Sequence, residues 1–149
     1  MNTSGEINGS NGINIVEKCL IVTLPNAIDN DIIESIKNNL LEKVSRNKLN
    51  GVIFDFSSLT IMDSYEFTEF IQLSRMIKLF GVPTLFVGLQ PGIVSALVDL
   101  NIDTDELLTF LNLEHGLNFL RKENSIQAED EEAEDNINSE TEGTMMNDE

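Results

Sequence analysis

A buried-strand pattern that runs directly into a short polar loop and a helix start constrains this chain more than any other feature. Val52, Ile53, Phe54 and Phe56 form an apolar run of strand length that only Asp55 interrupts. Such a run is typical of a strand that is covered on both faces. A covered strand followed by a helix predicts a βαβ unit, in which a helix crosses over between parallel strands.

The residues after this strand predict a capped helix start. The apolar spacing becomes helical from Phe67, Asp63 is a good N-cap, and Glu66 can complete a capping box with it. Ser64 then falls in the first turn, where a phosphate would meet unpaired N–H groups and the positive end of the helix dipole. The pattern leaves two interpretations open: Ser64 only starts the helix well, or it is a site of modification.

Strand and helix patterns alternate over residues 13–121. The predicted strands are Ile13–Val16, Cys19–Leu24, a strand from Val52 and Thr84–Leu89, and the predicted helices are Ala27–Lys48, Ser64–Phe80, Pro91–Leu100 and Leu113–Arg121. This order predicts an α/β fold with a mixed, mostly parallel sheet of four or five strands and about four helices. Residues 1–12 are polar and glycine-rich and residues 122–149 are acidic, so we expect a flexible leader, one domain at 13–121 and a disordered tail.

Acidic residues dominate the charge of the chain. The formal net charge is -17, and eleven of the 26 acidic residues lie in residues 123–149, which contain no Lys or Arg. Binding a polyphosphate requires Lys and Arg to displace its counterions, so we do not expect a nucleic-acid partner. The tail is either a solubilising, self-repelling extension or a mimic of an acidic partner that tethers a basic surface.

The sequence also indicates where the protein works. Cys19 is the only cysteine, which predicts no disulfide, no cysteine metal cluster and a reducing compartment, with Cys19 itself buried on a strand. The N-terminus lacks the basic and apolar regions of a signal peptide, and the longest apolar stretch, Leu85–Val98, is too short to span a bilayer. We therefore expect a cytoplasmic protein without a membrane partner, a metal or a cofactor.

Catalytic chemistry has little support in the sequence. His115, the sole histidine, lies far along the chain from Ser64 and is expected to be a solvated helix residue. Asp63 beside Ser64 lacks the histidine or lysine that would activate the hydroxyl, and Gln90–Gly92 is a helix start and not a phosphate loop. We expect no enzyme activity; the alternatives are a module that binds a nucleotide or small ligand at Gln90–Gly92 and a serine hydrolase that uses Ser64.

Two predicted helices carry apolar residues beyond those that a sheet would bury. On the helix from Ser64, the face expected against the sheet holds Phe67, Phe70, Ile71, Ser74 and Ile77. The other side mixes apolar and polar residues, which suits docking, so the expected partner contacts are Asp63, Tyr65, Thr68, Gln72 and Met76. The helix from Pro91 is apolar around nearly its whole circumference and is either wholly buried or shared with a partner.

Two ordered motifs carry a family resemblance that covers residues 13–121. Ser57–Ser64 reads SSLTIMDS, and one βα unit later residues 84–102 read TLFVGLQPGIVSALVDLNI. Together they resemble the STAS domain of the anti-sigma factor antagonists, and within that family most of all the small scaffold proteins of the stressosome. The resemblance implies a domain without catalysis of its own, in which a kinase of the anti-sigma type phosphorylates Ser64, the serine after Asp63.

The resemblance implies partners as well. It implies that the domain binds and sequesters that serine kinase, releases it when Ser64 is phosphorylated, and assembles with sister STAS-domain proteins into a large homo- or hetero-oligomeric scaffold. The long acidic tail and the glycine-rich leader depart from the small members of the family, which leaves the identity of the partners open.

Overall fold

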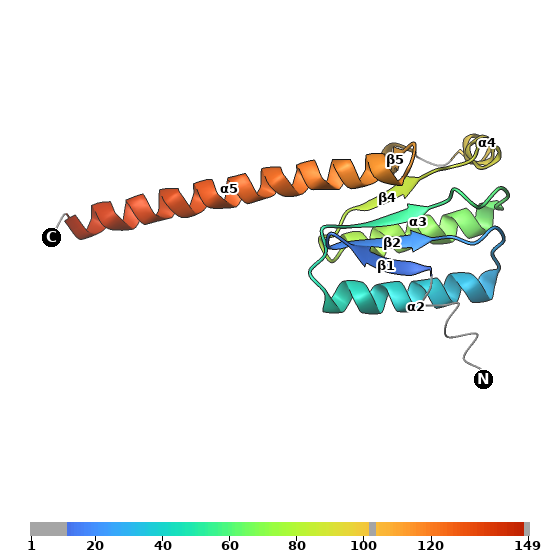
Figure 1. Cartoon of the computed structure of the whole chain (residues 1–149), viewed down its shortest axis with the longest axis horizontal. Helices are drawn as coiled ribbons and strands as arrows, with labels where there is room; N and C mark the ends of the chain where they lie inside the picture. Colours follow the sequence, from blue (N-terminus) through green and yellow to red (C-terminus); the bar gives the residue numbers. More distant parts are fainter. Residues whose placement is uncertain (1–11, 102–103, 148–149) are drawn as a thin grey trace. The chain divides into compact units, whose positions relative to one another are not determined.

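The computed structural model describes the backbone of residues 12–101 and 104–147, and side chains as far as residue 134 apart from Thr104 (Figure 1). The described elements are β1 (Ile13–Val16), β2 (Cys19–Thr23), α2 (Asn30–Arg46), β3 (Gly51–Asp55), α3 (Ser64–Lys78), β4 (Thr84–Val87), α4 (Pro91–Asp99), the 3-10 helix η1 (Thr104–Glu106), β5 (Leu108–Phe110) and α5 (Leu113–Asn147). The chain divides into two units, one ending at Leu117 and the other starting at Asn118, and the first holds every described strand.

A sheet in the order β1-β2-β3-β4-β5 forms the centre of the first unit, with five strands among the described residues. β1 pairs antiparallel with β2, and the other neighbouring strands are parallel. Glu17 and Lys18 join β1 to β2 and both have a positive φ, which suits the tight turn of a right-twisted hairpin. The predicted α/β fold with a mixed, mostly parallel sheet is confirmed.

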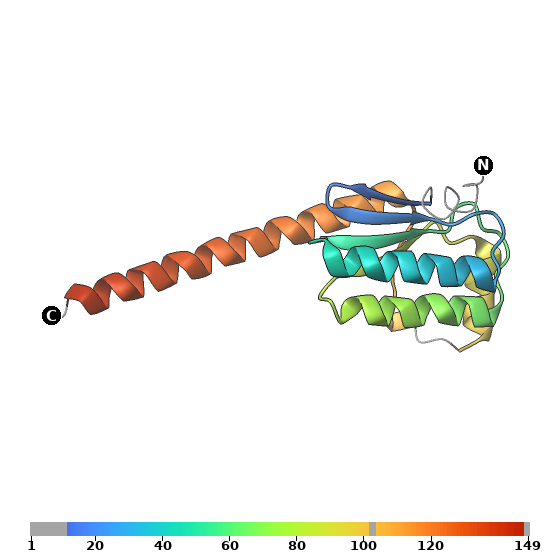
Figure 2. The same ribbon diagram turned by 90° about the horizontal axis from the view of Figure 1, so that it is seen from below.

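Helices α2 and α3 cover one face of this sheet, side by side (Figure 2). Val22, Phe54 and Phe86 are register partners on β2, β3 and β4 that share this face, and each is at most 1% exposed. They belong to one apolar cluster with the buried stripes of the helices, which are Ile33, Ile36, Leu40 and Val44 on α2 and Phe67, Phe70, Ile71, Leu73 and Ile77 on α3. Burial of these stripes is the main force that holds both helices to the sheet.

The start of α5 covers part of the opposite face. Ile53, Leu85 and Val87 alternate with the residues of the first face and are fully buried. A Cβ at Gly116 would lie 3.0 Å from Cγ1 of Val87 and 3.5 Å from Cδ1 of Leu85. The absence of a side chain at Gly116 therefore lets the helix backbone lie directly on the sheet, and β3 is covered on both faces as its sequence predicts.

The C-terminal part of the chain differs from the prediction. The predicted helix end at Arg121 is wrong, because α5 continues to Asn147. Residues 122–142 contain neither Pro nor Gly and are rich in Glu, a good helix former, so nothing in their backbone chemistry stops the helix. The expected leader, residues 1–12, lies outside the described residues except for Gly12, and the division into leader, domain and tail stays a prediction.

Two further differences concern short elements. β5 was not predicted because its three residues, LTF, are mostly exposed and too few to show an alternating pattern. In α4, Ile93 and Leu97 are buried, but Val94 and Val98 are 43% and 71% exposed. The alternative of a wholly buried helix is therefore wrong, since α4 packs on one side only, and its sharing with a partner stays a prediction.

Candidate phosphorylation and docking site

The start of α3 has the cap that the sequence predicts. Asp63 Oδ1 accepts a hydrogen bond from the N–H of Glu66 at 2.8 Å, and Glu66 Oε2 accepts one from the N–H of Asp63 at 3.1 Å. This capping box makes Ser64 the first helical residue. The Ser64 side chain is exposed, and its hydroxyl has no hydrogen-bond partner in the described part of the chain. A modifying enzyme can therefore reach this hydroxyl without unfolding the helix.

Buried side chains fix the loop that leads to Ser64. Phe56, Leu59 and Met62 are 0%, 0% and 7% exposed, and the N–H of Leu59 donates to the carbonyl of Phe56 at 3.0 Å. Ile61 lies between these anchors and is 82% exposed. The loop is thus held in the core at three points while it presents Ile61 and Ser64 to solvent.

A second set of contacts ties this loop to the turn after β4. Asp55 Oδ1 accepts hydrogen bonds from the N–H and the hydroxyl of Ser57, at 3.0 and 2.5 Å. Gln90 Nε2 donates to the carbonyl of Ser57 at 3.1 Å, and Gly88, with φ at +69°, packs against the Ser57 hydroxyl. We call Asp55, Ser57, Gly88 and Gln90 the loop brace. The sequence does not predict that these four residues come together, although an Asp two residues before a Ser directly after a strand is a known turn signal.

Replacing Gly88 by Ala is expected to destabilise the fold by about 2–4 kcal/mol. A Cβ there would overlap Ser57 Oγ and lie 3.3 Å from Asp55 Oδ1, so the loop brace must open in addition to the strain of a positive φ. Gly81→Ala is the matched control, because Gly81 has a φ of +78° but open space around the added Cβ. The free energy of unfolding of this control, measured by urea denaturation, should fall by only about 1–2 kcal/mol. Equal losses for both variants would show that the brace adds nothing.

The predicted docking residues follow one side of α3 from Ser64. We call Tyr65, Thr68, Gln72 and Met76 the α3 stripe, since residues three and four apart are neighbours on a helix. Tyr65 is 60% exposed, Thr68 and Gln72 are also exposed, and the Thr68 hydroxyl donates to the carbonyl of Ser64 at 2.8 Å. Met76, which was expected to be exposed on this side of the helix, is half-buried. The stripe is therefore open to solvent from Tyr65 to Gln72 and less so at Met76.

The face that α3 turns to the sheet also differs from the prediction in one position. Leu73 is buried at 2% exposure, whereas Ser74, which was expected on this face, is half-buried and donates from its hydroxyl to the carbonyl of Ile71 at 2.6 Å. A leucine reaches the core from the flank of a helix, because its side chain is longer than that of serine. The other predicted inward residues are buried as expected.

The charges around Ser64 are negative. Residues 49–74 and 79–120 contain no Lys or Arg, and Arg75, three turns along α3, pairs with Glu106 at 3.0 Å. Asp63 and Glu66 are the acidic residues of the capping box itself. The helix terminus favours a phosphate on Ser64 by roughly 0.3–2 kcal/mol, and these two carboxylates repel it. A phosphate on Ser64 would therefore remain without a neutralising cation from its own loop or helix start.

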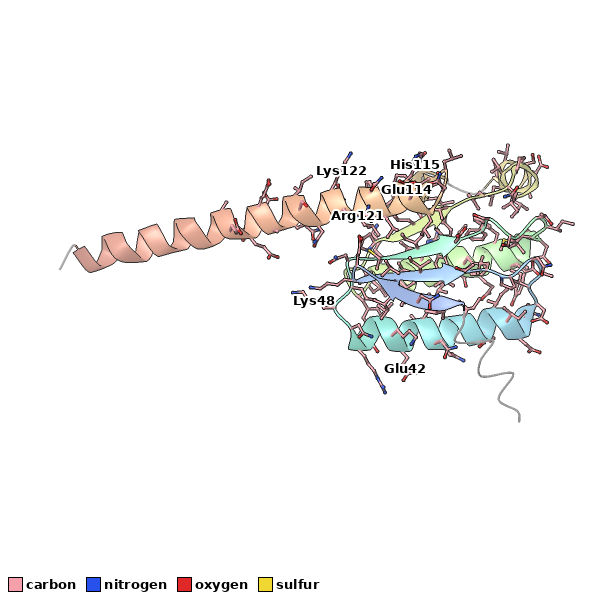
Figure 3. The ribbon with its side chains drawn as sticks, viewed as in Figure 1. Glu42, Lys48, Glu114, His115, Arg121 and Lys122 are labelled. Atoms are coloured by element: carbon pink, nitrogen blue, oxygen red, sulfur yellow. The ribbon has the colours of Figure 1, made fainter. Side chains whose placement is uncertain are left out.

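The alternative sites have weaker support. No group of three or more His, Cys, Asp and Glu among the described residues could hold a metal ion. His115 lies exposed on α5, as predicted, and Figure 3 labels it there. A cavity of about 920 Å³ lies against β2 and the start of α2. Its described lining includes none of residues 90–92 and contains Asp29 and Asp31 but no Lys or Arg. Such a lining does not suit the phosphates of a nucleotide.

Fold and site together define a class of protein. A mostly parallel sheet presents an exposed serine at the start of a crossover helix, beside a mixed helix surface, so the domain is suited to protein recognition. The STAS domain family model matches residues 12–116, and the chain belongs to this family. The resemblance drawn from the two sequence motifs is thereby confirmed.

Relatives in Bacillus subtilis match most of this chain. It is 28% identical over 105 residues to RsbT co-antagonist protein RsbRA of Bacillus subtilis strain 168, a match covering 70% of this chain and 38% of that protein. RsbT co-antagonist protein RsbRB of the same organism is 23% identical, and the match covers 72% of this chain and 39% of that protein. The matches thus span about two fifths of these relatives.

Solved structures show the same fold. Moorella thermoacetica RsbS, in a variant with a serine replaced by glutamate, has a TM-score of 0.67 and 26% identity, over 74% of this chain and 93% of that one. A chain in a structure of the stressosome has a TM-score of 0.66 and 26% identity, and the match covers 74% of this chain and 96% of that one. No helix among the described residues is long and apolar enough to cross a membrane.

Proposed function

We propose that this chain is a non-catalytic, phosphorylation-regulated interaction module of the anti-sigma factor antagonist type. It binds and sequesters a serine kinase of the anti-sigma type through Asp63 and the α3 stripe, and it releases the kinase when Ser64 is phosphorylated. The observation that carries this proposal is the hydroxyl of Ser64 at the first position of α3, which is exposed and has no hydrogen-bond partner among the described residues. Exposed Ile61 and Tyr65 flank it, which suits contact with a protein.

The physical basis of release is the cost of burying an uncompensated charge. A phosphate on serine adds about -1.5 to -2 charges at neutral pH. At an interface this dianion would be removed from water next to Asp63 and Glu66, without a cation from this chain in residues 49–74. Burying an unpaired charge costs several kcal/mol, and each 1.4 kcal/mol is about tenfold in affinity. The unmodified hydroxyl has no such cost.

We also propose that the chain works within an assembly of sister STAS-domain proteins, as a homo- or hetero-oligomer in the cytoplasm. The named relatives support this proposal, since one is a co-antagonist of RsbT and another is part of a stressosome. The acidic balance of the chain supports protein partners over nucleic acid. No cofactor is required for this role.

Phosphorylation of the purified full chain by a kinase of the anti-sigma type, with ATP and magnesium, tests the proposed site directly. We expect mass spectrometry to find the phosphate on Ser64, and Ser64→Ala to abolish its incorporation. Ser58→Ala is the matched control, because Ser58 is an exposed serine of the same loop and should leave incorporation unchanged. Modification of another residue, with Ser64 unmodified, would contradict the proposal.

A further inference from the structure

Five of the seven Lys and Arg residues of the first unit gather at the opposite end of α3 from Ser64. We call this surface the basic end and define it as the five residues Lys18, Lys43, Arg46, Lys48 and Lys78. They lie where α2 and α3 end and where β1 turns into β2. The N–H of Asn50 donates to the carbonyl of Lys18 at 2.8 Å, which joins the hairpin turn to the loop that follows Lys48. Figure 3 labels Lys48 at this end of the sheet.

The charges of the basic end are largely uncompensated. Within the part of the chain that the structure describes, none of its four lysines has an ion-pair partner. Arg46 pairs with Glu42 at 3.1 Å, but both side chains are mostly exposed, so this pair is weak. Helix dipoles favour cations at the ends of α2 and α3, yet Lys18 and Lys48 lie outside both helices. Local structure therefore does not account for the whole cluster.

The chain itself contains a complementary segment. Residues 129–134 read EDEEAE, with five carboxylates in six residues, all exposed and without a partner among the described residues. The carboxylates near Ser64 are less available, because Asp29 caps α2, Asp55 binds Ser57 and Asp63 caps α3. The acidic segment thus matches the basic end in charge number and has no competing contact.

We propose that residues 129–134 of a second copy of this chain dock on the basic end. This contact joins the tail of one copy to the domain of another, and it leaves Ser64, Tyr65 and Thr68 free at the opposite end of α3. It also gives the acidic tail a role as the partner of a basic surface. Because the contact is made of exposed ion pairs, it weakens when salt screens them, with a Debye length of about 10 Å at 0.1 M.

Sedimentation analysis of the full chain over a range of protein concentrations tests this contact. Raising sodium chloride from about 50 mM to about 500 mM should lower the self-association constant roughly tenfold or more. Lys48→Glu and Glu132→Lys should each weaken self-association several-fold, and an equimolar mixture of the two variants should recover it, since the mixture restores opposite charges. Lys37→Glu is the control: it makes the same charge change in the middle of α2 and should have no effect.

Three results would overturn the proposal. A chain that stays monomeric at every concentration has no such contact. Self-association that neither Lys48→Glu nor Glu132→Lys alters uses another surface. If the chain remains a monomer and both variants change its sedimentation coefficient, the tail folds back on its own domain. Circular dichroism should be used to check that each variant is folded. Ser64→Ala should self-associate as the unmodified chain does, so this test does not depend on the phosphorylation proposal.

Discussion

Ser64→Asp is expected to weaken binding of an anti-sigma-type kinase by about 100-fold or more, while Ser64→Ala keeps the affinity within about threefold. Both variants remove the hydroxyl, so its loss cannot explain a difference between them. The aspartate places a carboxylate on the exposed first residue of α3, beside Asp63 and Glu66, in a stretch (residues 49–74) that contains no Lys or Arg. Burying that third carboxylate in an interface then destabilises the complex, which titration calorimetry measures as a dissociation constant.

A charge added elsewhere should leave kinase binding intact. Ser45 is an exposed serine on α2, outside the α3 stripe, so Ser45→Asp changes the net charge equally. We expect its dissociation constant to stay within about twofold of the unmodified chain at physiological salt, where distant charges are screened. Equal weakening by Ser45→Asp and Ser64→Asp would mean that net charge, and not the position of the serine, governs binding.

Phe54→Ala is expected to lower the free energy of unfolding by about 3–5 kcal/mol, the largest stability effect that we foresee for a single substitution. Phe54 is fully buried on β3, with ring centroids 5.4 Å from Phe70 and 5.6 Å from Phe86. Removing its ring leaves a cavity between the sheet and α3 and also removes the aromatic contacts with Phe70 and Phe86. Denaturation in urea, followed by circular dichroism, measures the loss.

Phe80→Ala is the control for this prediction. Phe80 follows α3 and is 52% exposed, so its truncation removes the same atoms without opening a closed cavity. We expect a loss of about 1 kcal/mol or less, typical of a surface substitution. A loss for Phe54→Ala no larger than for Phe80→Ala would show that the phenylalanine cluster does not hold β3 and α3 together.

The stability of the site depends on the same cluster. Phe56, directly after β3, stacks with Phe67 in the first turn of α3, at a centroid distance of 6.0 Å. These two rings hold both ends of the segment that leads from β3 to Ser64 and the first turn of α3. The position of the serine is therefore set by core packing as well as by the capping box.

The local features of the fold could be predicted because each depends on residues close in sequence. The apolar run from Val52 predicts a covered strand, and the spacing of Asp63 and Glu66 predicts the capping box that the structure contains. The predicted bounds of α2 differ by at most three residues from those observed, since helix ends carry weaker signals than helix centres.

The features that were missed depend on contacts between distant residues. The loop brace joins Ser57 to Gln90 across 33 positions, and no local pattern indicates that hydrogen bond. β5 is a short edge strand that forms because β4 offers it a partner. The length of α5 was missed for a different reason: a run of acidic residues is typical of disorder and equally compatible with a helix.

The most direct test of the phosphorylation switch is the dissociation constant of the kinase for one preparation of the chain before and after stoichiometric phosphorylation, with Ser64 confirmed as the modified residue. We expect the phosphorylated chain to bind at least about 100-fold more weakly and dephosphorylation to restore the original value. An unchanged dissociation constant, or tighter binding after Ser64 is phosphorylated, would contradict the proposed switch.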